Sequence, residues 1–498
     1  MTASAPSPFG IGWFILYGHF GVPAVKFMPD LRALGARRTK IYLFWQQLEP
    51  EPGRYDWSAP DAFVDQLKSP DEGLIALCSS SMWATRTRSA MLPPSPALDL
   101  EQYRRLVATM VDRYRGRVRF WQNDCEPTNP VFWAGTAEEY VAQLRVFSSA
   151  VREADPDAVV VLGGHDGLFR PGELGPGRGF PRQEEGLAFF DHVVATAPDA
   201  FDLFDLRLYA DPYTIVPRVE HMRRRLAALG AEQPIVCTEY GGPGLFEFAE
   251  NRAHVSLMST WSATTTTTDA SGAPMSDTTS AQRIAALYDE MASLPAQTQM
   301  FMQGCAPELE AKLRRLQSRD LVQRNVLALS AGVPWTMYWE LVAAPGPRDD
   351  LMNLMFGKVG LLGPCGDGLR VVSPVAEVFA RMARTLGDVR AVARIEVADR
   401  PEVFLFRVER GDAAAMYVAW ERRDAFTGED VPATEVQIPR LAALARDDNG
   451  LAALARDDIP PRSVRATDVF GSSVDARVEE GMLRLPLSVT PVYVEARD

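Results

Sequence analysis

Two glutamates close strand-like runs of this sequence, and the chemistry that a pair of carboxyl groups can perform is the first feature to interpret. Glu126 ends "VRFWQNDCE" just before a proline, and Glu239 ends "PIVCTE". Hydrolysis of a glycosidic bond with retention of configuration needs two carboxyl groups roughly 5–5.5 Å apart, one protonated and one ionised. Each glutamate also has an ordinary structural interpretation, because Glu-Pro often begins a helix and "TEYGG" is compatible with a turn. A fold that brings both strand ends together favours the catalytic interpretation.

The elements around these glutamates indicate such a fold. Up to about residue 385, short β-rich runs alternate with amphipathic helical segments such as 100–116 and 136–154. The predicted strands are 11–17, 39–45, 73–80, 118–123, 158–164, 203–209, 234–239 and 334–340. Eight strands that are each followed by a helix predict an α/β protein with a (β/α)₈ TIM barrel, and a doubly wound open sheet is the alternative. In a barrel, Glu126 from strand four and Glu239 from strand seven meet at the C-terminal mouth.

Two further segments complete the predicted organisation. The catalytic barrel, residues 1–385, contains a long insert between strands seven and eight, residues 241–333, with helical candidates at 281–294 and 308–331. From 386 to 498 the sequence changes to short strands separated by Gly, Asp and Pro, which predicts a small antiparallel β-sandwich.

Other polar and aromatic residues at the same strand ends are candidates for binding a substrate. Aromatic rings suit the apolar faces of sugars, and polar groups suit their hydroxyls. These candidates are His19, Trp45, Trp83, Asn123, His165, Tyr209, Trp339 and Glu340. Each also has a structural alternative, such as a packed core Trp or Tyr or a hydrogen-bonded His.

The composition and charge of the chain limit the kinds of partner, location and cofactor to be expected. The net charge of −13 argues against binding to nucleic acid or to anionic membranes. The sequence has no apolar run of about 18 residues, and its N-terminal apolar stretch has no preceding Lys or Arg, so a cytoplasmic location is expected. The five cysteines form no CxxC pair, which predicts free thiols. Neither zinc-ligand spacing nor a phosphate-binding loop occurs, so we expect no metal or cofactor.

Several motifs in order along the chain resemble those of one enzyme clan. They are "FWQQLEPEPGRYDW" (44–57), "FWQNDCEP" (120–127), "PIVCTEYGG" (234–242), "TMYWEL" (336–341), "FGKVGLL" (356–362) and the closing "SVTPVYVE". The sequence resembles the retaining (β/α)₈ glycoside hydrolases with glutamates on strands four and seven, and its layout is most similar to the β-xylosidase/iduronidase-like members with a C-terminal β-domain. The resemblance implies that Glu126 is the acid/base and Glu239 the nucleophile, that Tyr209 bonds the nucleophile, and that Trp339 is a sugar platform.

The sequence departs from the clan at two positions. Cys125 stands where the clan has an Asn that hydrogen-bonds the 2-hydroxyl of the sugar, and Lys40 stands where a strand-two Arg supports the nucleophile. Because a thiol is a weak hydrogen-bonding group, we expect a substrate other than a plain gluco- or galacto-configured β-pyranoside with an equatorial 2-hydroxyl.

These inferences predict a retaining glycoside hydrolase that acts by double displacement on oligosaccharides or small glycosides, from the chain end. Burial and the charge of Glu239 are expected to keep Glu126 protonated near neutral pH. Two alternatives remain open: a transglycosidase using the same residues, and a catalytically silent carbohydrate-binding barrel.

Overall fold

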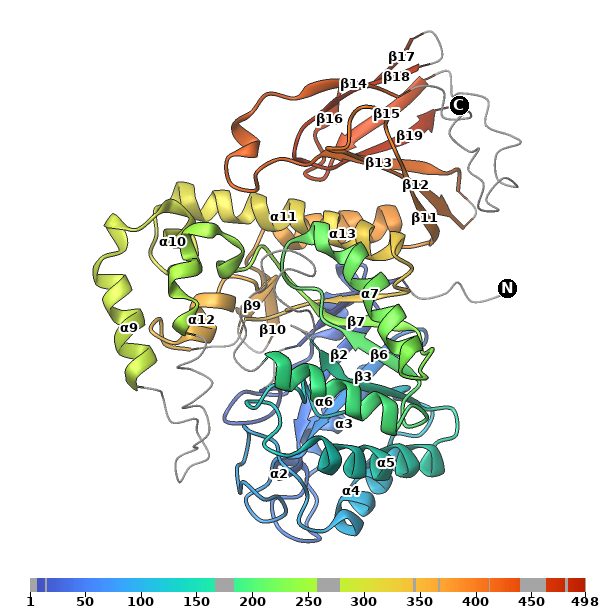
Figure 1. The fold of residues 1–498 in the computed structure, drawn as a ribbon, viewed down its shortest axis with the longest axis vertical. Coiled ribbons are helices and arrows are strands. Elements are labelled where there is room, and N and C mark those ends of the chain that lie inside the picture. Colours follow the sequence, from blue (N-terminus) through green and yellow to red (C-terminus); the bar gives the residue numbers. More distant parts are fainter. Residues whose placement is uncertain are drawn as a thin grey trace.

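Eight parallel strands close into a barrel, which confirms the predicted fold and excludes the open sheet (Figure 1). The computed structural model describes residues 7–13, 16–165, 183–257, 278–343, 346–365, 368–411, 413–438, 463–479 and 482–497. The barrel strands are β1 (Phe9–Gly12), β2 (Arg38–Phe44), β3 (Glu72–Cys78), β4 (Phe120–Asn123), β5 (Val159–His165), β6 (Leu203–Leu206), β7 (Ile235–Tyr240) and β8 (Thr336–Tyr338). They pair in sequence order, and β8 pairs with β1.

Helices cover the outside of the barrel (Figure 1). They are α1 (Met28–Ala33), α3 (Ser58–Val64), α4 (Leu100–Arg113), α5 (Ala137–Ala154), α6 (Gln183–Thr196), α7 (Ile215–Ala228), α11 (Pro307–Ser330) and α13 (Val375–Leu386). Their starts follow capping chemistry: the Asp99 side chain accepts two backbone N–H groups at the start of α4, and Thr136 with Glu139 forms a capping box on α5. In the part of the chain that the structure describes, no helix is long and apolar enough to cross a membrane.

Five barrel strands are shorter than predicted, and the difference is largest for the first, sixth and eighth. The first predicted strand, 11–17, is observed as Phe9–Gly12, because Trp13 and Tyr17 leave the barrel and pack their rings on Phe27. The eighth is only Thr336–Tyr338. The sixth ends at Leu206, yet the chain continues beside β7, where the Leu208 N–H donates to the Glu239 carbonyl at 3.2 Å.

The insert between β7 and β8 forms a lobe with its own core. It contains η2 (Leu245–Glu247), η3 (Ala249–His254), α9 (Thr278–Asp289), η4 (Met291–Ser293), α10 (Ala296–Gln299) and α11. Its apolar side chains pack together with those of α12 (Leu351–Phe356), which follows β8. Figure 1 shows α9, α10 and α12 side by side on one flank of the barrel. The predicted helices at 281–294 and 308–331 correspond to α9 and α11.

The C-terminal region is antiparallel, as predicted. A six-stranded sheet joins β11 (Val389–Ile395), β12 (Val403–Arg410), β13 (Met416–Glu421), β19 (Val492–Arg497), β15 (Ser463–Asp468) and β16 (Ser473–Val474), and a three-stranded sheet joins β14 (Thr434–Ile438), β18 (Met482–Leu487) and β17 (Arg477–Glu479). Alternation along β12 explains its continuous burial: Val403 and Leu405 face the second sheet, whereas Phe404 and Phe406 belong to the barrel core. A separate hairpin, β9 (Leu362–Cys365) and β10 (Gly368–Val371), precedes α13.

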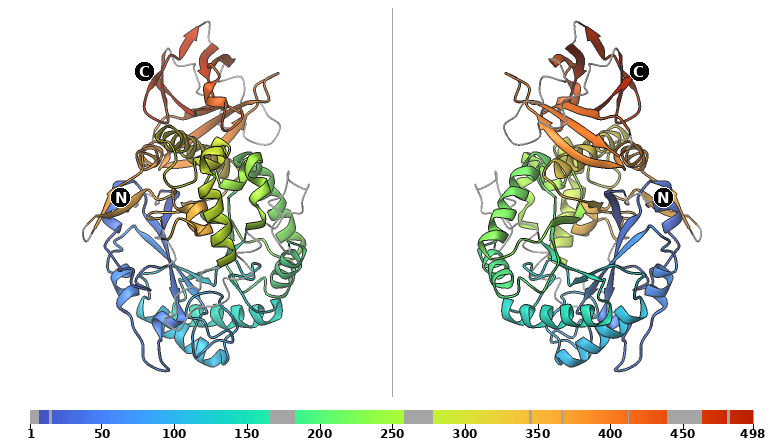
Figure 2. Two further views of the ribbon diagram at one scale, coloured as in Figure 1. Left: turned by 90° about the vertical axis from the view of Figure 1, so that its left-hand side faces the viewer. Right: turned by 90° about the vertical axis from the view of Figure 1, so that its right-hand side faces the viewer.

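Helix α11 lies between the barrel and the C-terminal sheets (Figures 1 and 2). Toward the sheets, the Gln323 amide donates to the carbonyl of Val489 at 3.1 Å, and Arg315 pairs with Glu429 at 2.9 Å. The helix is thus buried on the side away from the barrel as well.

The same helix contacts the strands that carry the site. The Asn325 amide donates to the Tyr240 hydroxyl at 2.7 Å, and the buried Arg324 guanidinium donates to the carbonyl of Leu208 at 2.9 Å. Because Tyr240 directly follows Glu239 on β7, α11 supports the seventh strand from behind.

Candidate active site

A single arginine lies between the two predicted catalytic glutamates. Arg207, two positions beyond Asp205 of β6, is completely buried. Its Nη1 forms a close ion pair with Glu239 Oε2, and its Nε lies 3.6 Å from Glu126 Oε1. The carboxyl groups from the ends of β4 and β7 therefore meet at one guanidinium, as the barrel topology requires of residues at strand C-termini.

Two phenols also donate to Glu239, which is 6 % exposed. The Tyr42 hydroxyl of β2 donates to Oε1, and the Tyr209 hydroxyl donates to Oε2 at 3.3 Å. Burial raises the pKa of Tyr42 well above its ordinary value, so this phenol stays a hydrogen-bond donor. Together with Arg207, these donors stabilise an ionised carboxylate at Glu239.

Lys40 approaches the same carboxylate from β2. Its Nζ lies 3.6 Å from Glu239 Oε1 and donates to Thr238 Oγ1 at 2.9 Å. Burial and the nearby Arg207 lower the pKa of Lys40 to about 8. The lysine predicted from the strand-two motif is thus next to the nucleophile candidate, although its contact is longer than that of Arg207.

A polar layer inside the barrel supports these groups from below. Asp205 accepts the Thr238 N–H at 2.7 Å, the Thr238 hydroxyl at 2.5 Å and the Gln122 amide at 3.1 Å. Its Oδ2 also lies 3.8 Å from Arg207 Nε. Two cations, Lys40 and Arg207, are therefore balanced by two anions, Asp205 and Glu239, and Glu126 adds no uncompensated charge when it is protonated.

The backbone after β4 is strained where it presents Glu126. Asp124 has φ +53° and Glu126 has φ +42°, in the left-handed region that non-glycine residues rarely adopt. Such conformations cost roughly 1–3 kcal/mol each and cluster at functional sites. The Asp124 carboxylate is held by the Ser79 N–H at 2.7 Å and the Gln143 amide at 3.3 Å, which fixes the turn.

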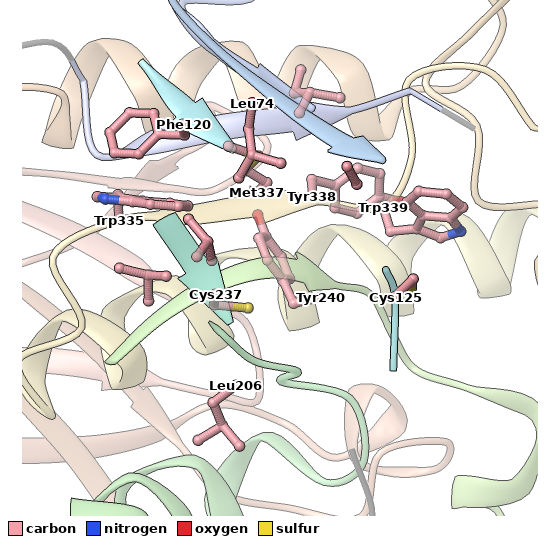
Figure 3. Close-up of a cluster of buried hydrophobic side chains, with 14 of the residues drawn as sticks. Leu74, Phe120, Cys125, Leu206, Cys237, Tyr240, Trp335, Met337, Tyr338 and Trp339 are labelled. Carbon is pink, nitrogen blue, oxygen red and sulfur yellow. The ribbon is translucent and has the colours of Figure 1, made fainter. Parts of the chain in front are cut away.

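Cys125 lies between the two strained residues and faces the arginine. Its Sγ accepts from Arg207 Nη2 at 3.0 Å and lies 3.6 Å from the Tyr42 hydroxyl. Figure 3 labels Cys125 and Trp339 at one end of the buried cluster, and Phe120 and Trp335 at the other. The Trp339 ring is edge-on to Tyr42 with centroids 6.0 Å apart, so it borders the group around Glu239.

Other predicted site residues lie elsewhere. Asn123 is on the outer side of β4, where its Oδ1 accepts the Tyr103 hydroxyl of α4 at 2.5 Å, because side chains alternate along a strand. Trp45 starts the short α2 (Trp45–Leu48), is fully buried and donates to Glu49 at 2.8 Å. A ring without exposed surface offers no platform for a sugar.

The remaining candidates do not join the glutamates through described contacts. Trp83 donates to the Glu49 carbonyl at 2.9 Å and packs on Trp45. His19 stacks on Phe44, and burial lowers its pKa to about 4, which keeps it neutral at pH 7.

The last two candidates, Glu340 and His165, follow β8 and end β5. Glu340 is 1 % exposed and buried beside β9, where its carbonyl accepts the Leu361 N–H. His165 closes β5 opposite Leu206, and its side chain lies outside the described residues.

The central residue of this arrangement, Arg207, was not among the predicted residues. A signal existed in "FDLRLY", where Asp205, Arg207 and Tyr209 alternate with apolar residues and so share one face of an extended chain. The structure adds that Gly164 leaves room for this side chain, because a Cβ there would overlap Arg207 Nε and lie 2.5 Å from Asp205 Oδ2. All five cysteines are free. Within the described ranges, no three His, Cys, Asp or Glu residues are placed to hold a metal ion.

Solved structures that resemble this chain are glycoside hydrolases. A family 39 glycoside hydrolase from the gut symbiont Bacteroides cellulosilyticus WH2 aligns with a TM-score of 0.61 and 16% identity, over 99% of this chain and 81% of that one. A glucosidase from Croceicoccus marinus aligns at 0.52 with 12% identity, over 100% of this chain and 97% of that one. The catalytic domain of xylanase C, of family GH30, from Talaromyces cellulolyticus aligns at 0.51 with 12% identity, over 99% and 97%.

These likenesses show that the chain has the fold of those enzymes. No protein-family model matches the sequence, and no curated protein matches it.

Proposed function

We propose that this protein is a retaining glycoside hydrolase. The observation that supports the proposal is the meeting of Glu126 and Glu239 at the buried guanidinium of Arg207, at the C-terminal mouth of the barrel. Glycosidases of this kind need one carboxyl group that gives a proton and one that attacks carbon. The environments of the two glutamates differ: Glu239 is surrounded by donors, whereas the side chain of Glu126 is 19% exposed and lies 3.6 Å from the Nε edge of the guanidinium.

The reaction would proceed in two displacements. Glu239 attacks the anomeric carbon while Glu126 gives its proton to the leaving oxygen, and a glycosyl ester forms on Glu239. Glu126, now a carboxylate, takes a proton from water as the water oxygen bonds to the same carbon and releases Glu239. Trp339, beside Tyr42, would contact the apolar face of the sugar.

The substrate class is an oligosaccharide or a small glycoside, cleaved from its end. The aligned structures include a glucosidase and a xylanase, which differ in the sugar they act on. Because Cys125 replaces a carboxamide that would bond a 2-hydroxyl, we propose a sugar other than plain β-glucose or β-galactose. Cys125→Asn should then slow turnover of the preferred substrate. Efficient β-glucoside hydrolysis that becomes faster in Cys125→Asn would refute this choice of sugar.

The decisive experiment starts from a panel of 4-nitrophenyl glycosides, which includes β-glucoside, β-galactoside, β-xyloside and β-mannoside. NMR of the first product should show retained configuration. A mechanism-based fluoro-sugar should then label Glu239, and Glu239→Gln should lower turnover by several orders of magnitude while the fold is kept. The matched control is Glu340→Gln, which removes another buried glutamate. Labelling of Glu340, inverted product or sugar binding without turnover would each overturn the proposal.

Glu126 is tested separately. Glu126→Ala should slow glycosides with poor leaving groups far more than activated aryl glycosides, because only the former need a proton. Azide should restore the second step and yield a glycosyl azide of retained configuration. Equal losses for every leaving group, without rescue, would exclude Glu126 as the acid. Transfer of the sugar to an added acceptor in preference to water would identify a transglycosidase on the same residues.

A further inference from the structure

Arg207 contacts both carboxyl groups of the proposed reaction, and the negative charge moves from one carboxyl group to the other as the reaction proceeds. In the first displacement the Glu239 carboxylate becomes a neutral ester, and in the same step Glu126 loses its proton. One negative charge therefore disappears at one end of the guanidinium and appears at the other. In the second displacement the ester C–O bond breaks, Glu126 gains a proton from water, and the charge returns to Glu239.

We propose that Arg207 is a positioning residue that stabilises whichever glutamate is ionised, Glu239 before the first displacement and Glu126 after it. This inference rests on the proposed function. In the structure the guanidinium lies in close contact with Glu239, and its Nε is 3.6 Å from Glu126. When Glu239 is esterified, the nearest remaining reactive carboxylate is that of Glu126.

An arginine suits this role because of its shape. The guanidinium is planar and carries its donors on several edges, so Nη1 and Nε can face different carboxylates at once. An ammonium group is a point charge and cannot face both. Lys40 illustrates the difference, because its Nζ pairs with Glu239 at 3.6 Å and makes no ion pair with Glu126 in the described part of the chain.

Described neighbours on three elements hold the guanidinium in place. Gly164 on β5 leaves room for it, Asp205 lies 3.8 Å from Nε, and Cys125 accepts from Nη2 at 3.0 Å. Among the described residues, the charged and titratable groups around Arg207 include Lys40 and Tyr42 from β2, Cys125 and Glu126 after β4, Asp205 on β6, Tyr209 beyond it, Arg218 of α7, which donates to the Arg207 carbonyl, and Cys237 and Glu239 on β7.

The experiment compares Arg207→Met, Arg207→Lys and the matched control Lys40→Met. Each variant removes or alters one buried cation beside Glu239, but only the Arg207 variants change the contact with Glu126. The substrates are 2,4-dinitrophenyl glycosides of the sugar that the panel identifies. Their leaving group needs no proton, so release of the sugar from Glu239 limits kcat, and kcat/KM reports the first displacement.

Arg207→Met should lower both kcat/KM and kcat by about 10- to 100-fold, the loss expected for one charged hydrogen bond. The acid limb of kcat should move to higher pH by about one unit, because Glu126 in the ester form has lost its cation. Because kcat and kcat/KM fall by similar factors, KM should change little, and the glycosyl-enzyme, whose hydrolysis still limits kcat, should be visible in mass spectra. Arg207→Lys should recover kcat/KM in part and leave the acid limb of kcat displaced. Lys40→Met should lower kcat/KM and leave that limb in place.

Two outcomes would overturn the inference. One is an acid limb of kcat that stays at the wild-type pH in both Arg207 variants. The other is a Lys40→Met variant whose acid limb moves as far as that of Arg207→Met. If Arg207→Met does not fold, Arg207→Lys decides alone, since it keeps the buried charge. A wild-type protein without turnover on the panel would instead remove the proposed function itself.

Discussion

Gly164 lies so close to Arg207 that one added methyl group tests how much the position of the guanidinium matters. A Cβ at position 164 would overlap Nε and lie 2.8 Å from Cζ of Arg207, and 2.5 Å from Asp205 Oδ2. Ordinary contact begins near 3.4 Å, so Cζ must move by at least about 0.6 Å (3.4 − 2.8). The guanidinium is completely buried and cannot move into solvent.

The size of the effect follows from this displacement. Overpacking of a filled interior costs about 1–3 kcal/mol of unfolding free energy. A misplacement approaching 1 Å in an active site can cost on the order of 100-fold in rate. Gly164→Ala should therefore lose about 1–3 kcal/mol of stability and between 10- and 100-fold in kcat/KM, although every charged group is still present.

The assay combines urea unfolding with turnover of the panel substrate. Gly186→Ala on α6 is the matched control, because its Cβ would meet Thr128 O at 3.5 Å, an ordinary contact. It should keep full activity and gain up to ~1 kcal/mol from helix propensity. The stability cost of Gly164→Ala should be smaller in an Arg207→Met background, where the flexible thioether can yield. A cost that is unchanged in that background would refute the reasoning.

Three further predictions concern other groups. Tyr209→Phe removes the donor 3.3 Å from Glu239 Oε2 and should lower kcat/KM by about 10- to 100-fold with little change in Tm; a change below twofold would contradict it. Burial raises the pKa of Asp124 to about 7 from 3.8, so the folded state binds this proton more tightly than the unfolded state does. The free energy of unfolding should therefore fall by at most ~4 kcal/mol as the pH rises from 4 to 7. Urea unfolding at pH 5 and 7.5 measures this loss, which should be absent in Asp124→Asn. Burial opposes the ionisation of Glu429, but its arginine partners on α11 outweigh it and lower its pKa to about 2 from 4.5. Stability from this pair is therefore present above pH 4.5 and lost toward pH 2, and Glu429→Gln should lower Tm at pH 7 and lose less on acidification in calorimetry.

The fold was predictable from the sequence because its signals are local and repeated. Alternating β-rich and helical runs define a barrel even when single strands are misjudged at their ends, as at 11–17, where apolar residues continue past Gly12 into a packed loop. The antiparallel C-terminal region was predictable from its turn residues. Side-chain direction was harder: Asn123 lies one position from Gln122, yet the two side chains face opposite sides of β4.

Contacts across the barrel could not be predicted in the same way. The neighbours of Arg207 come from β2, β5, β6, β7 and the turn after β4, and no spacing along the chain shows which side chain fills the space between them. Lys40 was predicted from a motif, whereas the ion pair closer to Glu239 comes from β6. Trp45 was expected to bind substrate because it ends a predicted strand, but it begins the short helix α2 and is buried.

The position of α11 determines where the chain can be truncated without exposing buried residues. The helix is part of the insert before β8, yet one side holds Tyr240 beside the nucleophile candidate and the other holds the C-terminal sheets. Deleting residues 386–498 would uncover Gln323, which is 5% exposed in the whole chain and donates to the Val489 carbonyl, and would remove Phe404, whose ring lies 4.8 Å from that of Tyr213. The apparent boundary is therefore unsuitable for cutting the chain, and an expression fragment that ends there would carry an open apolar surface directly behind its seventh strand.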